Sequence, residues 1–392
     1  MPKQAKQKQT RPKPLFIETS ALTSRNLSGI GHTLLAILRE WQINEAAQSK
    51  FTPILLVPFD KKTQIEQLGL GIRIKTIPLP ELVVRGLRRF NMLPYMDIFL
   101  GKGDYLFPNY WNWPLLFSRS FTYAYDVSFL VYPEFTETQN QKFLARYIKT
   151  WLQRADGVIT ISHHAKDELV KYTKIDSRKV TVIYNGIDTL PSKSVTQSSI
   201  KDIKTKYAIN GEYLLFIGNI EPRKNIQRLI SAYRLLPKLL KDRYSLVLVG
   251  AYGWKNEGIK QSIQLAVKDG LNVIKIDAYV PDADIVQLYA GAEVLVHPAL
   301  YEGFGMTPLE AMAAGTPTIV GNNSSLPEVM GNASLYIDAT NEQDISVKIR
   351  ELLVNGSLRN KLIKAGNTRV RQFTWRSTTE KIAAFIEGRS NG

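Results

Sequence analysis

The chain has 392 residues, of which 44% are hydrophobic and 22% charged, and this is typical of a globular protein with two domains. It has no cysteine, which excludes disulfides, thiolate metal sites and cysteine catalysis, and it has neither a bilayer-length apolar run nor a signal peptide, which favours a cytoplasmic location. The net charge of +16 favours phosphorylated substrates or an anionic membrane as partners over nucleic acid, because no nucleic-acid-binding module is recognisable.

Strands and helices alternate through the first half of the chain. Residues 1–14, rich in Lys, Gln and Pro, are expected to form a disordered basic tail. The predicted strands are 15–18, 53–57, 121–127, 157–161 and 180–184, and the predicted helices are 33–41 and 139–154. A glycine turn with Gly29 and Gly31 separates the first strand from the first helix. This alternation predicts a parallel, doubly wound α/β domain over residues 15–190.

A second α/β series follows a polar segment, 189–200, which is the best candidate for a linker. The predicted strands are 213–217, 245–249, 273–276, 294–297 and 318–320, and the predicted helices are 226–236, 283–289 and 308–314. We therefore expect a second Rossmann-like domain over residues 200–372, facing the first across a cleft. An apolar-faced helix over 373–392 is expected to end the chain.

A pair of cations follows the first strand of the second domain. The segment Gly218–Asn225 reads G-N-I-E-P-R-K-N and leads into an amphipathic helix, for which Asn225 is a suitable N-cap. Ligands of open α/β sheets bind at the carboxyl ends of strands, and a helix N-terminus there favours an anion. Arg223 and Lys224 could therefore bind a diphosphate. The alternative is an exposed Arg–Lys pair in a turn.

Gly29 and Gly31 make a weaker case of the same kind. Glycines between a strand and a helix allow backbone amides to approach a phosphate closely. Their spacing is not the dinucleotide-binding fingerprint, and an ordinary tight turn is an equally good interpretation.

Two carboxylates follow the predicted strand 294–297. Glu302 lies in a glycine-punctuated loop, and Glu310 lies one turn into the following helix. Carboxylates accept hydrogen bonds from hydroxyl-rich ligands, and the two could contact opposite ends of one nucleotide-sugar. Alternatively, Glu310 could close a capping box with Thr307, as Glu328 could with Ser325.

The motifs together resemble one enzyme family. Glu302 and Glu310, with E-G-F-G and L-E-A-M-A-A-G-T-P around them, resemble the signature of family-four retaining glycosyltransferases of the GT-B fold. Gly218–Asn225, the segment A-D-G-V-I-T-I-S ending at Ser162, and N-G-I-D at 185–188 resemble other landmarks of this family. The resemblance extends from about residue 15 beyond Trp375 and implies two Rossmann-like domains around a central cleft.

The resemblance implies a role for each site residue. Arg223 and Lys224 would hold the donor diphosphate, Glu310 would bind the ribose hydroxyls, and Glu302 would bind hydroxyls of the transferred sugar or act as a nucleophile. Asp126 is included among the catalytic positions. The remaining positions implied in donor binding are Gly29, Gly31, Gly218, Tyr279, Val280, Gly303, Phe304, Gly305 and Met306.

The family transfers with retention and usually without a metal, and the nucleotide-sugar is a substrate, so no cofactor is expected. We expect front-face attack by the acceptor hydroxyl, with the departing phosphate as base. One position departs from the family pattern: a histidine commonly precedes Asp126, and here it is Tyr125. A phenol is far less basic than an imidazole, so the role of that histidine cannot be assigned to it. His163 and His164 are expected to be structural.

Donor, acceptor and membrane contacts are less defined. The motifs most resemble bacterial mannosyltransferases of polysaccharide assembly, so GDP-mannose is favoured, and UDP- or dTDP-sugars remain alternatives. Residues 82–93 mix aliphatic and basic residues at helical spacing, and with Trp111 and Trp113 they suggest docking to the inner face of the cell membrane and a lipid-linked saccharide acceptor. The alternative functions are a catalytically inert nucleotide-sugar-binding protein, a related phosphorylase or epimerase, and a nucleic-acid binder.

Overall fold

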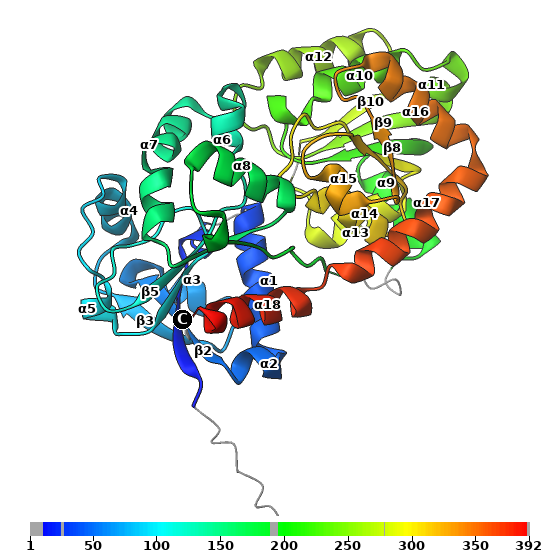
Figure 1. Cartoon of the computed structure of the whole chain (residues 1–392). Coiled ribbons are helices and arrows are strands. Elements are labelled where there is room, and N and C mark those ends of the chain that lie inside the picture. Colours follow the sequence, from blue (N-terminus) through cyan, green and yellow to red (C-terminus); the bar gives the residue numbers. More distant parts are fainter. Residues whose placement is uncertain (1–10, 25–26, 189–194, 278, 390–392) are drawn as a thin grey trace, which may run out of the picture.

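The computed structural model describes residues 11–24, 27–188, 195–277 and 279–389, and it consists of two parallel sheets flanked by helices (Figure 1). The α/β prediction with two doubly wound domains is confirmed. Of the predicted disordered tail, 1–14, residues 1–10 lie outside the described residues. Strand β1 begins at Lys13, two residues before the predicted start, because the Lys13 amide donates to the Lys50 carbonyl at 3.0 Å and so extends the pairing with β2.

The first sheet has seven parallel strands, with the switch in strand order between β1 and β4. In sheet order the strands are β3 (Arg73–Ile77), β2 (Phe51–Pro58), β1 (Lys13–Glu18), β4 (Asp104–Phe107), β5 (Arg119–Tyr123), β6 (Gly157–Thr160) and β7 (Val180–Val182). Its helices are α1 (Gly29–Ile43), α2 (Glu45–Gln48), α3 (Lys62–Glu66), α4 (Glu81–Arg89), α5 (Asp97–Leu100), α6 (Ser128–Val131), α7 (Thr138–Arg154) and α8 (His163–Thr173). The central strands are buried, as both faces of such a sheet are covered.

The second sheet has six parallel strands, with the switch between β8 and β11. In sheet order they are β10 (Val273–Ile276), β9 (Tyr244–Val249), β8 (Glu212–Ile217), β11 (Val294–His297), β12 (Thr318–Gly321) and β13 (Ser334–Ile337). Its helices are α9 (Gln197–Lys206), α10 (Ile226–Arg234), α11 (Lys238–Arg243), α12 (Glu257–Lys268), α13 (Asp282–Ala290), α14 (Met306–Ala313), α15 (Leu326–Met330), α16 (Glu342–Val354) and α17 (Gly356–Arg369). The loops that follow β8 and β11 are the predicted binding loops, so the switch point lies where ligands of such sheets bind.

Several elements were not predicted. The predicted linker 189–200 ends in α9, which begins at Gln197 because the side chains of Thr196 and Ser199 cap it reciprocally. Residues 189–194 of that linker lie outside the described residues. Strands β3, β4 and β13 were missed. β3 is a partly exposed edge strand in which cations alternate with isoleucine, and β4 and β13 are four residues long.

The chain crosses between the domains twice, and the two crossings touch each other. Helix α18 (Trp375–Gly388) returns from α17 to pack against α1 of the first domain (Figure 1). The Ile187 amide donates to the Phe373 carbonyl at 3.2 Å, and the Thr378 hydroxyl donates to the Tyr184 carbonyl at 2.8 Å. Gly186 has no room for a side chain, because a Cβ there would lie 2.2 Å from the backbone nitrogen of Trp375.

A carboxylate of the second domain caps a helix of the first. Glu328, on α15, accepts hydrogen bonds from the backbone amides of His163 and His164, at 2.7 and 3.0 Å, and from the Tyr184 hydroxyl at 2.9 Å. The capping box predicted between Ser325 and Glu328 is therefore wrong, and Glu328 instead satisfies free amides at the start of α8. Such contacts hold the two domains together.

Candidate active site

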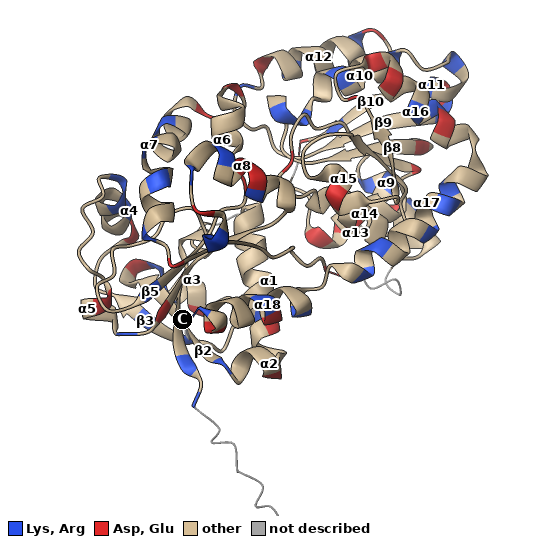
Figure 2. Cartoon of the chain, viewed as in Figure 1, with Lys and Arg blue, Asp and Glu red and all other residues tan. Residues whose placement is uncertain are grey.

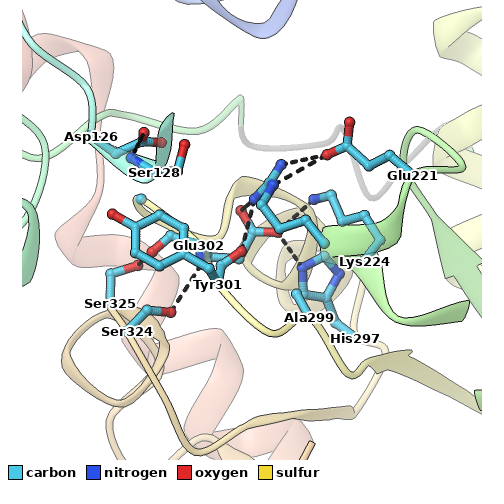
Figure 3. A network of polar contacts seen from close by, with 12 residues as sticks. Asp126, Ser128, Glu221, Lys224, His297, Ala299, Tyr301, Glu302, Ser324 and Ser325 are labelled. Carbon is cyan, nitrogen blue, oxygen red and sulfur yellow. Dashed lines mark hydrogen bonds and ion pairs between the residues drawn. The ribbon is translucent and has the colours of Figure 1, made fainter. Parts of the chain in front are cut away.

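Glu302 is the centre of the site. It lies in the loop between β11 and α14, only 8% exposed, and its two oxygens face three nitrogen-bearing side chains (Figure 3). Its Oε1 is 2.5 Å from Lys224 Nζ and 2.9 Å from His297 Nε2. Its Oε2 is 3.2 Å from an Arg223 nitrogen. The loop is fixed as well, because the Glu302 amide donates to Ser324 Oγ and its carbonyl accepts from the Ser325 hydroxyl.

The two cations come from the short 3₁₀ turn that follows β8, Pro222–Lys224. The Arg223 guanidinium also bonds the buried Glu221 at 2.8 Å and the Tyr301 carbonyl at 2.8 Å. Lys224 is only 8% exposed. The alternative of an exposed Arg–Lys pair is therefore wrong, since both cations converge on one carboxylate that is distant in the sequence.

Asn225 does not act as the predicted N-cap. Its backbone has φ 61°, and its side chain makes no capping hydrogen bond to α10. Instead its amide nitrogen donates to the Pro298 carbonyl at 3.0 Å and to the Ala339 carbonyl at 2.6 Å. Asn225 thus ties the cation turn to the loops that follow β11 and β13.

Neighbouring charges and burial act against each other in this cluster. Burial alone would raise the pKa of Glu302, but the charges of Lys224 and Arg223 hold it well below its usual range. Burial lowers the pKa of the Lys224 ammonium, and Glu302 opposes that effect. Burial and the Lys224 charge lower the pKa of His297, so the neutral imidazole is favoured. The cluster therefore pairs two cations, Arg223 and Lys224, with two carboxylates, Glu302 and Glu221.

Asp126 reaches this cluster from the first domain. Its Oδ1 accepts a hydrogen bond from the Ser128 amide at 2.9 Å, and a Cβ on Gly303 would lie 3.0 Å from its Oδ2. Glycine at position 303 is what allows this close approach. The Ser162 hydroxyl donates to the Gly303 carbonyl at 2.8 Å, which is a second contact between the domains at the same residue.

Tyr125, the departure from the family pattern, packs in the hydrophobic core of the first domain. Its side chain is 8% exposed and stacks on Tyr123, with ring centroids 5.2 Å apart, inside the hydrophobic core. Burial raises the pKa of its hydroxyl well above the usual value, and the hydroxyl has no hydrogen-bond partner among the described residues. Tyr125 therefore packs as a core residue and offers no acid or base to the site.

Glu310 lies one turn into α14 and accepts a hydrogen bond from the Tyr289 hydroxyl at 2.8 Å. The predicted capping box with Thr307 is wrong, because the helix begins at Met306 after Gly305, whose φ is 105°. Burial raises the pKa of Glu310, and the negative charge of Asp188 raises it further. The hydrogen bond from Tyr289 and the nearby His32 of α1 oppose this rise.

We expect donor affinity to depend on pH through Glu310. A raised pKa means that the carboxylate takes up a proton at a higher pH than an ordinary glutamate. Ribose hydroxyls donate best to the ionised form, so donor affinity should be complete above the raised pKa and be lost as the pH falls through it. Calorimetric titration of donor from pH 7.5 to 5 measures this. The Glu310→Gln variant should bind more weakly with a flat profile, and a wild-type slope retained in the variant would contradict the assignment.

The other predicted donor-binding positions are dispersed around this cluster. Gly29 begins α1 and has open space beside it, whereas Gly31 donates its amide to Ser28 Oγ at 3.3 Å and leaves no room for a Cβ beside the Ala21 carbonyl. Gly218, at φ 146°, borders the Lys224 side chain. The last group is exposed Tyr279, half-buried Val280 and the segment 303–306, whose Phe304 packs between Tyr184 and Phe373.

Sequence reasoning missed a second layer of polar residues. Glu221 and His297 were not assigned roles, yet Glu221 bonds Arg223 and His297 bonds Glu302. The Tyr301 hydroxyl donates to Glu168 Oε2 at 2.5 Å, and His164 Nε2 lies 3.3 Å from Glu168 Oε1. His164 therefore belongs to an interdomain network. A polar residue ending a buried strand was the available signal for His297.

Two family models match this chain. Residues 199–369 match the model described as "Glycosyl transferases group 1", and residues 107–189 match "Glycosyltransferase Family 4". The chain is 32% identical over 288 residues to O-antigen chain mannosyltransferase B of Escherichia coli, covering 72% of this chain and 74% of that protein. It is 34% identical to the serotype-specific mannosyltransferase WbdA of E. coli, covering 58% of this chain and 28% of that longer protein.

Solved structures share the fold. A glycosyltransferase from Rickettsia africae superimposes with a TM-score of 0.69 at 16% identity, covering 97% of this chain and 99% of that one. Anabaena HepE, in complex with UDP and glucose, superimposes with a TM-score of 0.71 at 16% identity, covering 96% and 100% of the two chains. At these identities the likeness concerns the arrangement of the two sheets.

Proposed function

We infer that this chain, which belongs to the group 1 and family 4 glycosyltransferases, is a hexosyltransferase that moves mannose from GDP-mannose onto a saccharide acceptor. The mannosyltransferase relatives support mannose as the sugar. One observation carries the proposal: the carboxylate of Glu302, suited to sugar hydroxyls, lies within 3.2 Å of both Arg223 and Lys224, which are suited to a diphosphate.

We propose that transfer retains configuration, as is usual in this family, and that Glu302 binds the sugar rather than attacking it. Charge develops on the diphosphate as it leaves, and Arg223 and Lys224 can stabilise it without rearrangement. We therefore propose that transfer needs no metal. A carboxylate held by two cations and an imidazole, with a strongly lowered pKa, is a weak nucleophile. Front-face attack by the acceptor hydroxyl, with the departing phosphate as base, is consistent with this arrangement.

A thermal-shift panel tests the donor. A ligand that binds only the folded protein stabilises it by about 2.7 kcal/mol at a hundredfold excess over Kd. We expect GDP and GDP-mannose to raise the melting temperature more than UDP, UDP-glucose or dTDP-sugars, with or without EDTA. The Lys224→Ala variant should lose most of the shift. A larger shift with UDP-glucose would replace mannose by glucose as the proposed sugar, and no shift with any nucleotide would contradict the proposal.

A nucleotide-sugar-binding protein without turnover is the second candidate, and the loss of the family histidine at Tyr125 is the observation that favours it. Turnover separates the two. Release of GDP from GDP-mannose by the wild type, as the mannosyl group passes to an added saccharide acceptor or to water, supports the enzyme if it is lost in Glu302→Ala. Equal inertness of wild type and variant, with donor still bound, would support the binding protein.

We propose that the outer edge of the first domain docks on an anionic membrane to reach a lipid-linked acceptor. No described helix is both long and apolar enough to cross a bilayer. Helix α4 carries exposed Arg85 and Arg89 at this edge (Figure 2), and Asp97 joins α5 to the loop before β5 by accepting from the amides of Leu116 and Phe117. The exposed apolar residues of this edge are Leu82, Val83, Phe90, Met92, Ile98, Phe99, Leu116 and Phe117.

The two tryptophans predicted to join this surface do not. Trp113 is buried against Phe107, with ring centroids 5.5 Å apart, and half-buried Trp111 lies under the Arg88 guanidinium at 3.8 Å. The apolar contact would come from α4, α5 and their loops.

Vesicle flotation is the test. A basic residue near an anionic surface contributes about 1 kcal/mol, so we expect Arg85→Gln with Arg89→Gln to lower partitioning about 30-fold. The matched control replaces Arg350 and Lys361, exposed on the second domain, by glutamine. Equal flotation of both double variants, or no preference of the wild type for anionic over neutral vesicles at low salt, would contradict the docking surface.

A further inference from the structure

A groove opens between the domains beside the Glu302 cluster. Its volume is about 630 Å³, which is within the usual range of ligand pockets. We call it the interdomain groove. It is lined by Tyr132, Glu134 and Phe135 of the first domain and, from the second, by Leu300, Asn322, Asn323, Tyr336, Ile337, Asp338, Ala339, Thr340 and Asp344.

The groove adjoins the sugar end of the candidate site. Leu300, which lines it, donates its amide to the Arg223 carbonyl at 2.9 Å and is two residues from Glu302. On its other wall, Asn323 is followed by Ser324, whose hydroxyl oxygen accepts from the Glu302 amide. Glu310, at the proposed ribose end, does not line it. A molecule in the groove would therefore approach the transferred sugar from the side opposite to the nucleotide.

The lining chemistry excludes an anionic occupant. Three of the twelve described lining residues, Glu134, Asp338 and Asp344, are acidic and none is Lys or Arg, although the chain has a net charge of +16. An acidic lining repels phosphates and nucleotides. Carboxylates, side-chain amides and a threonine hydroxyl are suited to hydrogen bonds with neutral hydroxyls.

Two aromatic rings complete the groove. Tyr132 and Phe135 stack on each other with centroids 5.3 Å apart, and Tyr132 also contacts the ring of Tyr301 at 5.6 Å. Flat apolar rings beside hydrogen-bonding groups provide what a sugar ring needs, because one face of a pyranose is apolar while its rim is hydroxylated.

The lining is held in place by bonds from both domains. Lys255 Nζ donates to the Glu134 carbonyl at 2.7 Å, and Trp254 Nε1 donates to the Phe135 carbonyl. Asp338 Oδ1 accepts from the Thr340 amide at 2.8 Å and from its hydroxyl at 2.6 Å. A lining fixed in this way loses little entropy when a ligand binds.

We propose that the interdomain groove binds the acceptor as a neutral oligosaccharide, with the sugar rings next to the attacking hydroxyl on Tyr132 and Phe135 and their hydroxyls on Asp338 and the asparagines. The proposal rests on the proposed function for the direction of transfer. It adds that the second domain, and not only the first, recognises the acceptor. The groove is complete only when the two domains are in contact.

Binding by the whole protein tests the groove without knowledge of the natural acceptor. The probes are α-mannobiose, α-mannotriose, maltotriose and cellobiose. Their binding is measured by saturation-transfer NMR with GDP present. We expect at least one probe to bind, and Tyr132→Ala and Asp338→Asn each to weaken it about tenfold, equivalent to about 1.4 kcal/mol. Asp242→Asn, an exposed carboxylate of α11 paired with Lys238, is the matched control and should bind like the wild type.

The outcomes separate this proposal from the proposed function. Probe binding that is lost in both groove variants, while the nucleotide thermal shift stays normal, supports the groove. Absence of binding by every probe, undiminished binding in both variants, or tighter binding of mannose 6-phosphate than of neutral probes would overturn it. If no nucleotide binds while probe binding is still lost in the variants, the proposed function is contradicted and saccharide binding in the groove is still supported.

Discussion

Replacing Lys224 by alanine is expected to lower kcat/KM about 10²–10³-fold, which is the usual effect of removing one fixed donor to a developing negative charge. Lys224 is buried, and its Nζ is 2.5 Å from Glu302. Arg223 remains in the variant, so part of the charge on the leaving diphosphate is still stabilised. Initial rates at several donor concentrations measure the effect.

The control for this variant is Lys348→Ala. Lys348 forms a half-exposed ion pair with Glu351 on α16, so its loss should leave the rate unchanged. Thermal melting of both variants establishes that they are folded. A Lys224→Ala enzyme that is folded and within threefold of wild-type activity would contradict the assignment of the diphosphate to this cation.

Glu302→Ala is expected to lose at least about 100-fold in kcat/KM, for two reasons. The sugar hydroxyls lose their acceptor, and Lys224 and Arg223 lose the carboxylate that offsets their burial, so their positions relax. Glu302→Gln keeps the shape and one acceptor oxygen and should retain far more activity than the alanine variant. If Glu302 were instead a covalent nucleophile, the glutamine variant would fall by about 10⁴-fold or more, as nucleophile replacements do. Single-turnover rates of the two variants decide between the roles.

The sequence predicted the β11–α14 region closely. The strand Val294–His297 is observed as expected, because four apolar or buried residues are followed at once by Pro298 and a glycine-rich loop. The helix was expected from Pro308 and begins two residues earlier at Met306, since Gly305 takes a left-handed conformation that turns the chain directly into the helix. Local backbone chemistry determines this part of the site, and so it could be predicted.

The partners of the site residues could not be predicted in the same way. Glu328 matched a local capping pattern, but its carboxylate bonds amides 164 and 165 residues away. Asn225 matched an N-cap pattern, but its amide bonds carbonyls 73 and 114 residues away. A short polar side chain satisfies whichever backbone group the tertiary fold brings near, and one sequence does not state which. Tyr125 illustrates the same limit, because only the structure places its ring inside the core.

The contact between Gly186 and Trp375 bears on how product leaves. Because both connections between the domains meet at this one place, we expect them to act together as a hinge about which the two domains rotate. Opening would then separate Asp126 from Gly303 and Glu328 from α8 in one movement, while the residues at the hinge hardly shift. A bulkier residue at position 186 would push the two connections apart at the hinge, so that the two domains could no longer close on the donor.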